Sequence, residues 1–239
     1  MESVTINKVD HLDFYKSEAY KTLRTNIQFS GDDVKAIALT SCTPGEGKST
    51  VSFNLAIDMA RSGKRVVYID TDLRRTALVG RYRIQGATYG LTHFLTNQCT
   101  INDCIYSTNI PNLHMIAAGP TPPNPSELLG NKYFKQMMLA LRRVFDYIII
   151  DTPPLGSVID SAIVAKECDG AILIVKANTI DYRFAIKVKE QLEMSGCRIL
   201  GAILSMVPMK KKGYYSKYYN SYYGKDYSSD YSKQQGRRK

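Results

Sequence analysis

Short apolar runs alternate with longer amphipathic stretches along most of the chain. The runs are hydrophobic at nearly every position, which predicts strands that are buried on both faces of a sheet. The stretches between them are long enough for helices and carry apolar residues at helical spacing. We therefore expect strands at 36–40, 65–69, 113–117, 147–150, 171–175 and 199–204, and helices at 15–29, 48–62, 131–143 and 181–195.

This alternation is typical of an α/β fold with a doubly wound, mostly parallel sheet, in which ligands bind at the carboxyl ends of the strands. The 239 residues suffice for one such domain. We assign the domain to residues 1–209, with 15–29 as a leading helix, and treat 210–239 as a separate tail. No apolar run reaches the roughly 18 residues of a membrane span, and the polar start does not resemble a signal peptide. We expect a cytoplasmic protein whose five scattered cysteines stay reduced.

The C-terminal tail differs from the rest of the chain in composition. Residues 210–239 hold nine Lys or Arg and two Asp, so the tail carries +7 of the formal net charge of +10. It contains no Leu, Ile or Val, and we predict that it is disordered because it cannot bury enough apolar surface to offset its ordering entropy. Eight of the seventeen tyrosines lie in it, at Tyr214, Tyr215, Tyr218, Tyr219, Tyr222, Tyr223, Tyr227 and Tyr231.

Because the tail holds most of the charge, residues 1–209 are close to neutral, with 23 basic and 20 acidic side chains. A near-neutral domain argues against nucleic-acid binding by the domain itself. Basic residues interleaved with aromatic ones leave single-stranded RNA binding by the tail open. A basic tail is also suited to an anionic membrane surface, as are the loop residues Arg81 and Arg83.

The segment 43–50 has the features of a phosphate-binding loop. It follows a predicted strand and opens a predicted helix, which is the context such a loop requires. Its glycines let backbone amides curl around phosphate oxygens, Lys48 supplies a cation to the β- and γ-phosphates, and Ser49 offers a hydroxyl to Mg²⁺. The first glycine of the usual pattern is Cys42 here, so the match is incomplete. We expect a nucleoside triphosphate to bind at Pro44, Gly45, Glu46, Gly47, Lys48, Ser49 and Thr50.

Carboxylates follow two of the predicted strands. Asp70 and Asp72 come at the end of the strand 65–69, and Asp151 follows the strand 147–150. In a parallel sheet they emerge at the same edge as the phosphate-binding loop, so we expect Ser49, Asp70, Asp72 and Asp151 to hold Mg²⁺. Asp70 or Asp72 is also expected to accept a proton, and Lys48 completes the catalytic set. Each Asp alone could instead cap a helix, which is our interpretation of Asp160.

Three segments together resemble the bacterial tyrosine kinases of capsular and exopolysaccharide synthesis. They are Pro-Gly-Glu-Gly-Lys-Ser at 44–49, Tyr-Ile-Asp-Thr-Asp-Leu-Arg-Arg at 68–75 and Ile-Ile-Asp-Thr-Pro-Pro at 149–154, and the tyrosine cluster of the tail is a fourth match. The resemblance implies a P-loop tyrosine autokinase that uses MgATP and phosphorylates tail tyrosines of a neighbouring subunit. It also implies the split form of Gram-positive bacteria, in which a transmembrane protein activates the kinase at the inner face of the plasma membrane and a phosphatase opposes it.

The family also has a Glu-x2-Arg-x2-Arg pattern that helps subunits assemble into a ring. Here Glu18, Lys21 and Arg24 occupy its positions, and Lys21 keeps the charge of an arginine but lacks its bidentate fork. Without the resemblance, these residues would be a solvated helix face with an i,i+3 ion pair. A second departure is Ser205, where the family commonly has an asparagine directed toward the adenine.

Two alternatives to the kinase remain. A switch ATPase of the chromosome-partition or division-site kind shares the fold class, but its signature lysine is replaced by Thr43 here. The other alternative is a nucleotide-binding scaffold of a polysaccharide export complex, for which intact catalytic residues would not be needed.

Overall fold

The computed structural model describes residues 2–208. The predicted tail at 210–239, with its eight candidate phosphorylation sites, lies outside these residues. All five cysteines are described and are free thiols. Within residues 2–208, no helix has both the length and the apolar character that a membrane crossing requires.

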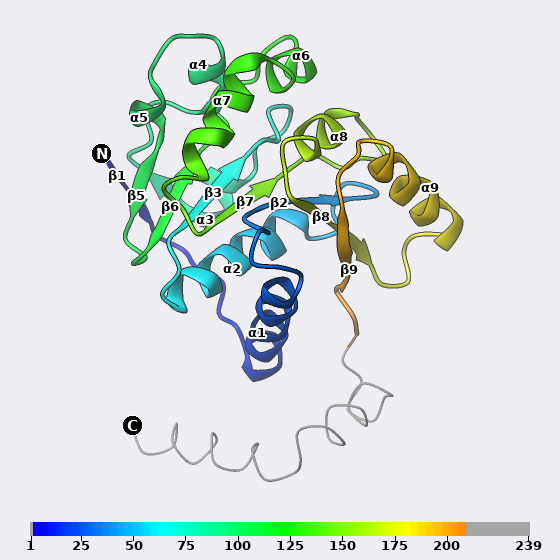
Figure 1. Ribbon diagram of the computed structural model, residues 1–239. Coiled ribbons are helices and arrows are strands. Elements are labelled where there is room, and N and C mark those ends of the chain that lie inside the picture. The colour runs from blue at the N-terminus through cyan, green and yellow to red at the C-terminus, as the bar shows by residue number, and fades with distance from the viewer. Residues whose placement is uncertain (1, 209–239) are drawn as a thin grey trace, which may run out of the picture. The chain divides into compact units, whose positions relative to one another are not determined.

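A nine-stranded sheet forms the centre of the domain (Figure 1). Its strand order is β4-β1-β5-β6-β3-β7-β2-β8-β9, and only the β1–β4 and β5–β6 pairs are antiparallel. The strand β2 lies between β7 and β8, so the chain returns to both sides of it through crossover helices. The strands are β1 (Ser3–Ile6), β2 (Ala36–Ser41), β3 (Val66–Asp70), β4 (Ile84–Gln85), β5 (Tyr106–Thr108), β6 (Leu113–Ile116), β7 (Tyr147–Asp151), β8 (Gly170–Lys176) and β9 (Ile199–Ser205).

Helices cover both faces of this sheet. On one face, Phe53 of α2 and Ile27 of α1 share an apolar cluster with Leu39 of β2. On the other face, Phe134 of α7 packs in a cluster with Ile150 of β7. The helices are α1 (Phe14–Phe29), α2 (Lys48–Arg61), α3 (Leu78–Tyr82), α4 (Leu91–Leu95), α5 (Ile101–Cys104), α6 (Pro125–Leu129), α7 (Lys132–Leu141), α8 (Asp160–Ala165) and α9 (Tyr182–Glu193).

Local signals in the sequence set the starts of the long helices. Asp13, Asn131 and Asp181 precede α1, α7 and α9, and each side chain accepts a backbone N–H of the first turn. Such N-caps stabilise a helix by about 1 kcal/mol each. Gly47 precedes α2 with a φ of 84°, a left-handed conformation that glycine adopts without strain.

The predicted fold class is confirmed. The six predicted strands lie within one residue of β2, β3, β6, β7, β8 and β9 at each end. The four predicted helices correspond to α1, α2, α7 and α9 within two residues. The sequence analysis missed β1, β4 and β5, because Ser-Val-Thr-Ile, Ile-Gln and Tyr-Ser-Thr are not continuous apolar runs. It missed the helices α3, α4, α5 and α6, because four or five residues are too few to establish a helical period.

Candidate functional site

The phosphate-binding loop joins the carboxyl end of β2 to the amino end of α2. Gly45 and Gly47 have φ values of 83° and 84°, in the left-handed region that favours glycine. Cys42 does not have a positive φ, which explains why this position needs no glycine. Cys42 is fully buried, and its burial, together with the nearby charge of Glu46, raises the pKa of its thiol to about 11.

Two buried polar side chains brace this loop. Glu46 is 1% exposed, and its carboxylate accepts the Cys42 N–H at 2.9 Å and the Thr43 hydroxyl at 3.2 Å. Ser205, at the end of β9, donates its hydroxyl to the Glu46 carbonyl at 2.6 Å. The Glu46 side chain is therefore turned inward, so only its backbone could face a phosphate. Ser205 likewise supports the loop by holding its backbone at the Glu46 carbonyl.

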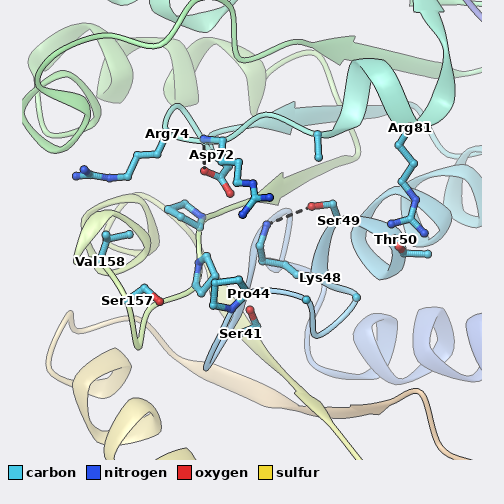
Figure 2. Close-up of a pocket in the computed structure, with 16 residues that line it drawn as sticks. Ser41, Pro44, Lys48, Ser49, Thr50, Asp72, Arg74, Arg81, Ser157 and Val158 are labelled. Carbon is cyan, nitrogen blue, oxygen red and sulfur yellow. Dashed lines mark hydrogen bonds between the residues drawn. The ribbon is translucent and has the colours of Figure 1, made fainter. Parts of the chain in front are cut away.

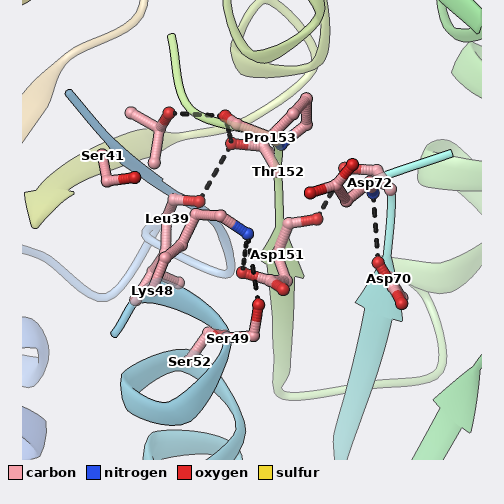
Figure 3. A network of polar contacts seen from close by, with 12 residues as sticks. Leu39, Ser41, Lys48, Ser49, Ser52, Asp70, Asp72, Asp151, Thr152 and Pro153 are labelled. Carbon is pink, nitrogen blue, oxygen red and sulfur yellow. Dashed lines mark hydrogen bonds and ion pairs between the residues drawn. The ribbon is translucent and has the colours of Figure 1, made fainter. Parts of the chain in front are cut away.

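Lys48 begins α2 and lies against the end of β7 (Figure 3). Its ammonium group is 2.7 Å from Asp151 Oδ1 and 3.3 Å from the Ser49 hydroxyl. Lys48 is 7% exposed and Asp151 1%. The Lys48–Asp151 pair therefore joins the phosphate-binding loop to the end of β7. The two residues can meet because β2, which leads into the loop, and β7 are neighbouring parallel strands.

Asp70 ends β3 beside Asp151, its register partner on β7. Asp70 is 2% exposed, and its carboxylate accepts the Thr76 hydroxyl at 2.8 Å and the Asp72 N–H at 3.1 Å. Burial, followed by the charge of Asp151, raises the pKa of Asp70 from 3.8 to about 7. Asp70 and Asp151 are thus two buried carboxylates with one lysine, Lys48, to balance their charge. A divalent cation bound nearby would stabilise the ionised form of both.

A cavity of about 530 Å³ opens above the loop (Figure 2). Lys48, Ser49 and Asp72 line it, whereas Asp70 and Asp151 lie beneath its surface. Burial raises the pKa of Asp72 above its ordinary value. The wall also contains three arginines that the sequence analysis did not assign to the site, Arg74, Arg75 and Arg81.

The acids of the predicted site therefore differ in their access to the cavity, because Asp72 lines it and Asp70 and Asp151 are buried beneath it. Residues two apart, such as Asp70 and Asp72, face the same side only on an extended chain, but β3 ends at Asp70 and Asp72 already belongs to the following loop. In the described part of the chain, no three His, Cys, Asp or Glu side chains form a ready metal cage. Mg²⁺ commonly uses only one or two protein carboxylates together with substrate phosphates, so this arrangement still fits the ion.

Asp160 is not a helix cap, which corrects the interpretation from the sequence. It is the first residue of α8, and its fully buried carboxylate accepts Arg74 Nε at 2.7 Å and Nη2 at 3.0 Å. The Ser126 hydroxyl of α6 also donates to it, at 2.6 Å. Burial by itself raises the pKa of Asp160, but the hydrogen bonds from Arg74 and Ser126 outweigh it and hold the pKa below its usual value. This bidentate pair anchors the loop after β3 to α8.

Three buried threonines hold the strand ends in place, and the sequence analysis missed them. The Thr71 hydroxyl donates to the Asp151 carbonyl at 2.7 Å, which ties β3 to β7. The Thr152 hydroxyl donates to the Leu39 carbonyl at 2.9 Å, and that of Thr40 to the Pro153 carbonyl at 2.9 Å. The only sequence signal was the Asp-Thr pair at the end of both β3 and β7, in which Asp is the last residue of the strand.

The residues predicted for subunit assembly lie on α1, outside the cavity lining. Lys21 pairs with Glu18 at 2.7 Å in the i,i+3 arrangement. Arg24 pairs with Asp58 of α2 at 2.7 Å, which fastens α1 to the domain. Both pairs lie within one chain, and a role in assembly stays a prediction.

The sequence matches the family described as AAA domain over residues 34–187. It is 46% identical over 190 residues to the tyrosine-protein kinase CpsD of Streptococcus agalactiae serotype III (strain NEM316), covering 80% of this chain and 82% of that protein. Among solved structures, the chimerical protein CapA2B2 is similar with a TM-score of 0.78 and 32% identity, over 87% of this chain and 95% of that one.

The fold also occurs in proteins that are less similar to this chain in sequence. The septum site-determining protein MinD of Pyrococcus horikoshii OT3, in complex with Mg-ADP, has a TM-score of 0.63 over 72% of this chain and 70% of its own. At 24% identity, this likeness concerns the fold alone.

Proposed function

Because the chain belongs to the bacterial tyrosine-protein kinases, we propose that it transfers the γ-phosphoryl group of ATP to tyrosines of the C-terminal tail of a neighbouring copy. The observation that carries this proposal is the convergence of Lys48, Ser49 and Asp72 on one cavity, with Asp70 and Asp151 directly below. A phosphoryl donor and an incoming hydroxyl require such a set of cations and carboxylates at one strand edge.

The chain's own groups account for binding and orientation of the donor. The amides of the loop at Gly45 and Gly47, the first turn of α2 and the ammonium group of Lys48 would hold the phosphates. Lys48 would exchange its contact with Asp151 for phosphate oxygens. Ser49, Asp70, Asp72 and Asp151 would hold Mg²⁺, which supplies charge neutralisation on the phosphates when bound.

During the transfer, the tyrosine oxygen bonds to the γ-phosphorus while the bond to the bridging oxygen breaks, and ADP leaves. The hydroxyl proton passes to a carboxylate of the site, and two are candidates. Asp72 lines the cavity and is the one an acceptor can reach directly. Asp70 has a pKa of about 7, which suits a proton acceptor at neutral pH, but it is 2% exposed. Comparison of the pH–rate profiles of Asp70→Asn and Asp72→Asn assigns the role, since replacing the acceptor removes its ionisation from the profile.

The proposed function is tested by mapping phosphate by mass spectrometry on protein isolated from its own cells. We expect phosphotyrosine mainly between Tyr214 and Tyr231, and its loss in Lys48→Met. Lys64→Met replaces an exposed lysine outside the cavity lining and serves as the control. An unmodified tail in a wild-type protein that still hydrolyses ATP would instead support the switch-ATPase alternative.

The proposal extends to the cellular setting. Through family membership we propose a role in capsular or exopolysaccharide synthesis and export, with a transmembrane activator that recruits the kinase to the inner face of the plasma membrane. The chimerical CapA2B2 protein is the comparison that supports a partner of the CapA type. We further propose a ring-like homo-oligomer that uses Glu18, Lys21 and Arg24, and an opposing tyrosine phosphatase.

A further inference from the structure

Two arginines of the cavity wall take no part in the contacts that brace the phosphate-binding loop and the strand ends. Arg75 lies in the loop after β3, and Arg81 belongs to α3. Both side chains are exposed and both line the cavity. Figure 2 shows Arg81 extending from α3 toward Thr50 at the start of α2.

The other cations of this wall are already paired with carboxylates. Lys48 contacts Asp151, and Arg74 makes a bidentate pair with Asp160. By contrast, within residues 2–208 neither Arg75 nor Arg81 forms an ion pair or a side-chain hydrogen bond. The guanidinium carbon of Arg81 lies 5.8 Å from the centre of the Tyr82 ring, a stacking contact that leaves its N–H groups available.

This part of the wall is therefore suited to an anion. A guanidinium group offers a planar fork of donors that matches phosphate oxygens. Arg75 and Arg81 together carry two positive charges, against the single negative charge of Asp72 in the cavity lining. The phosphate-binding loop, Lys48 and the first turn of α2 already supply donors for the nucleotide. The same cavity has an apolar side formed by Pro153, Pro154 and Val158, against which an aromatic ring can pack.

The acceptor segment has a matching pattern. Six of its tyrosines form adjacent pairs, 214–215, 218–219 and 222–223. The unmodified segment carries +7, so Arg75 and Arg81 repel it. Each phosphate adds about −1.5 to −2 charges at neutral pH, so it places a local anion beside the acceptor tyrosine even while the segment as a whole stays positive.

We propose that Arg75 and Arg81 form a phosphotyrosine subsite, so that the enzyme prefers an acceptor tyrosine whose neighbour is already phosphorylated. This inference rests on the proposed kinase function. It makes tail phosphorylation self-priming: the first transfer to a pair is slow, and the second is faster because the phosphate of the first holds the peptide in the cavity.

The test uses the full chain with its eight tail tyrosines changed to Phe, so that no tail tyrosine competes with the added peptides. Two peptides of residues 212–217 present Tyr215 as the acceptor, one with phosphotyrosine at 214 and one with Tyr214→Phe. We expect kcat/KM to be about tenfold higher for the phosphopeptide, the factor that corresponds to about 1.4 kcal/mol. Arg75→Gln combined with Arg81→Gln should reduce this ratio to within about twofold of one, as expected when the charged hydrogen bonds are lost. Arg83→Gln, an exposed arginine outside the cavity lining, should leave the ratio unchanged.

A second readout separates this inference from the proposed function. Binding of a fluorescent phosphopeptide to the nucleotide-free protein should weaken by about tenfold in the Arg75→Gln, Arg81→Gln variant, the same free-energy difference measured without turnover. If neither peptide is phosphorylated, the proposed function fails for this acceptor, and the binding measurement still decides on the subsite. Equal kcat/KM for the two peptides, or phosphopeptide binding that the double variant does not weaken, overturns the inference. A double variant that raises the KM for ATP while the phosphopeptide preference persists also overturns it, because the two arginines would then serve the nucleotide.

Discussion

Replacement of Asp70 by asparagine should stabilise the protein while lowering its kinase activity. Asp70 is 2% exposed and lies beside Asp151, with its oxygens bonded to the Thr76 hydroxyl and the Asp72 N–H. An asparagine has the same shape, can accept the Asp72 N–H, and can donate to the hydroxyl oxygen of Thr76. Asp70→Asn therefore removes a buried negative charge without leaving a new polar atom unpaired.

The pKa of Asp70 sets the size of the effect. Its increase from 3.8 to about 7 means that the folded state holds the ionised carboxylate at a cost. About three pKa units at about 1.4 kcal/mol each give about 4 kcal/mol as the upper limit at about pH 8. We expect a gain of about 2 to 4 kcal/mol, which for a domain of this length raises Tm by about 5 to 10 °C.

The gain must depend on pH with a defined sign. Between pH 3.8 and about 7 the folded wild type binds a proton that the unfolded chain does not, so its stability falls as pH rises through this window. Asparagine does not titrate. The difference between the variant and the wild type should therefore be small near the lower end of this window, grow through neutrality and become constant above it.

Urea unfolding from about pH 5.5 to about pH 8.5, without nucleotide or Mg²⁺, measures this difference. Asp160→Asn is the matched control, because Asp160 is equally buried but Arg74 and Ser126 hold its pKa below the usual value. The control should be less stable than the wild type by about 1 to 3 kcal/mol at the alkaline end, since the charged hydrogen bonds from Arg74 are lost. An Asp70→Asn variant that is destabilised at the alkaline end, or whose stability difference is the same at both ends of the range, would refute the reasoning.

Three further substitutions test how the loop is held. In Gly156→Ala the new Cβ would clash with the Cys42 carbonyl oxygen, so we expect a loss of about 1 to 3 kcal/mol in urea unfolding. Gly80→Ala, whose new Cβ meets nothing within 4 Å, is the control and should not destabilise the protein. Ser205→Ala removes the 2.6 Å hydrogen bond to the Glu46 carbonyl and should lower stability by about 1 kcal/mol; a KM for ATP equal to that of the wild type would show that this bond does not position the loop. Glu46→Ala leaves the buried Cys42 N–H without its partner and should cost about 1 to 3 kcal/mol. Glu46→Gln should recover most of this loss, and failure to do so would mean that the carboxylate charge, not the hydrogen bond, braces the loop.

The α/β class and the location of the site follow from local patterns in the sequence. Strands buried on both faces must be apolar at nearly every position, so β2, β3, β6, β7 and β8 could be identified from their residues alone. The strand β9 is also an apolar run, but it lies at the sheet edge, where its residues are exposed or half-buried except Ser205. The phosphate-binding loop is equally local, because its conformation depends on the glycines at 45 and 47 and on the helix that follows. Parallel strands also bring their carboxyl ends to one edge, and this rule alone predicts that Lys48 lies near Asp151.

Which side chains meet at that edge, and how exposed each one is, depends on the tertiary fold. Arg74 and Asp160 are 86 positions apart, and Ser205 and Glu46 are 159 apart, so no periodicity within a segment relates them. Asp70 and Asp72 are neighbours in sequence and yet differ in access to the cavity, because β3 ends at Asp70.

Arg75 and Arg81 show the same dependence on the fold. They are ordinary surface residues in the sequence, and they become part of the site only because α3 and the loop after β3 line the same cavity as the start of α2. Hydrophobic periodicity and glycine conformation act within one segment, whereas pairing and burial arise from packing between distant segments. For this reason the sequence locates the site, and the packed fold determines the partners and the ionisation of the groups in it.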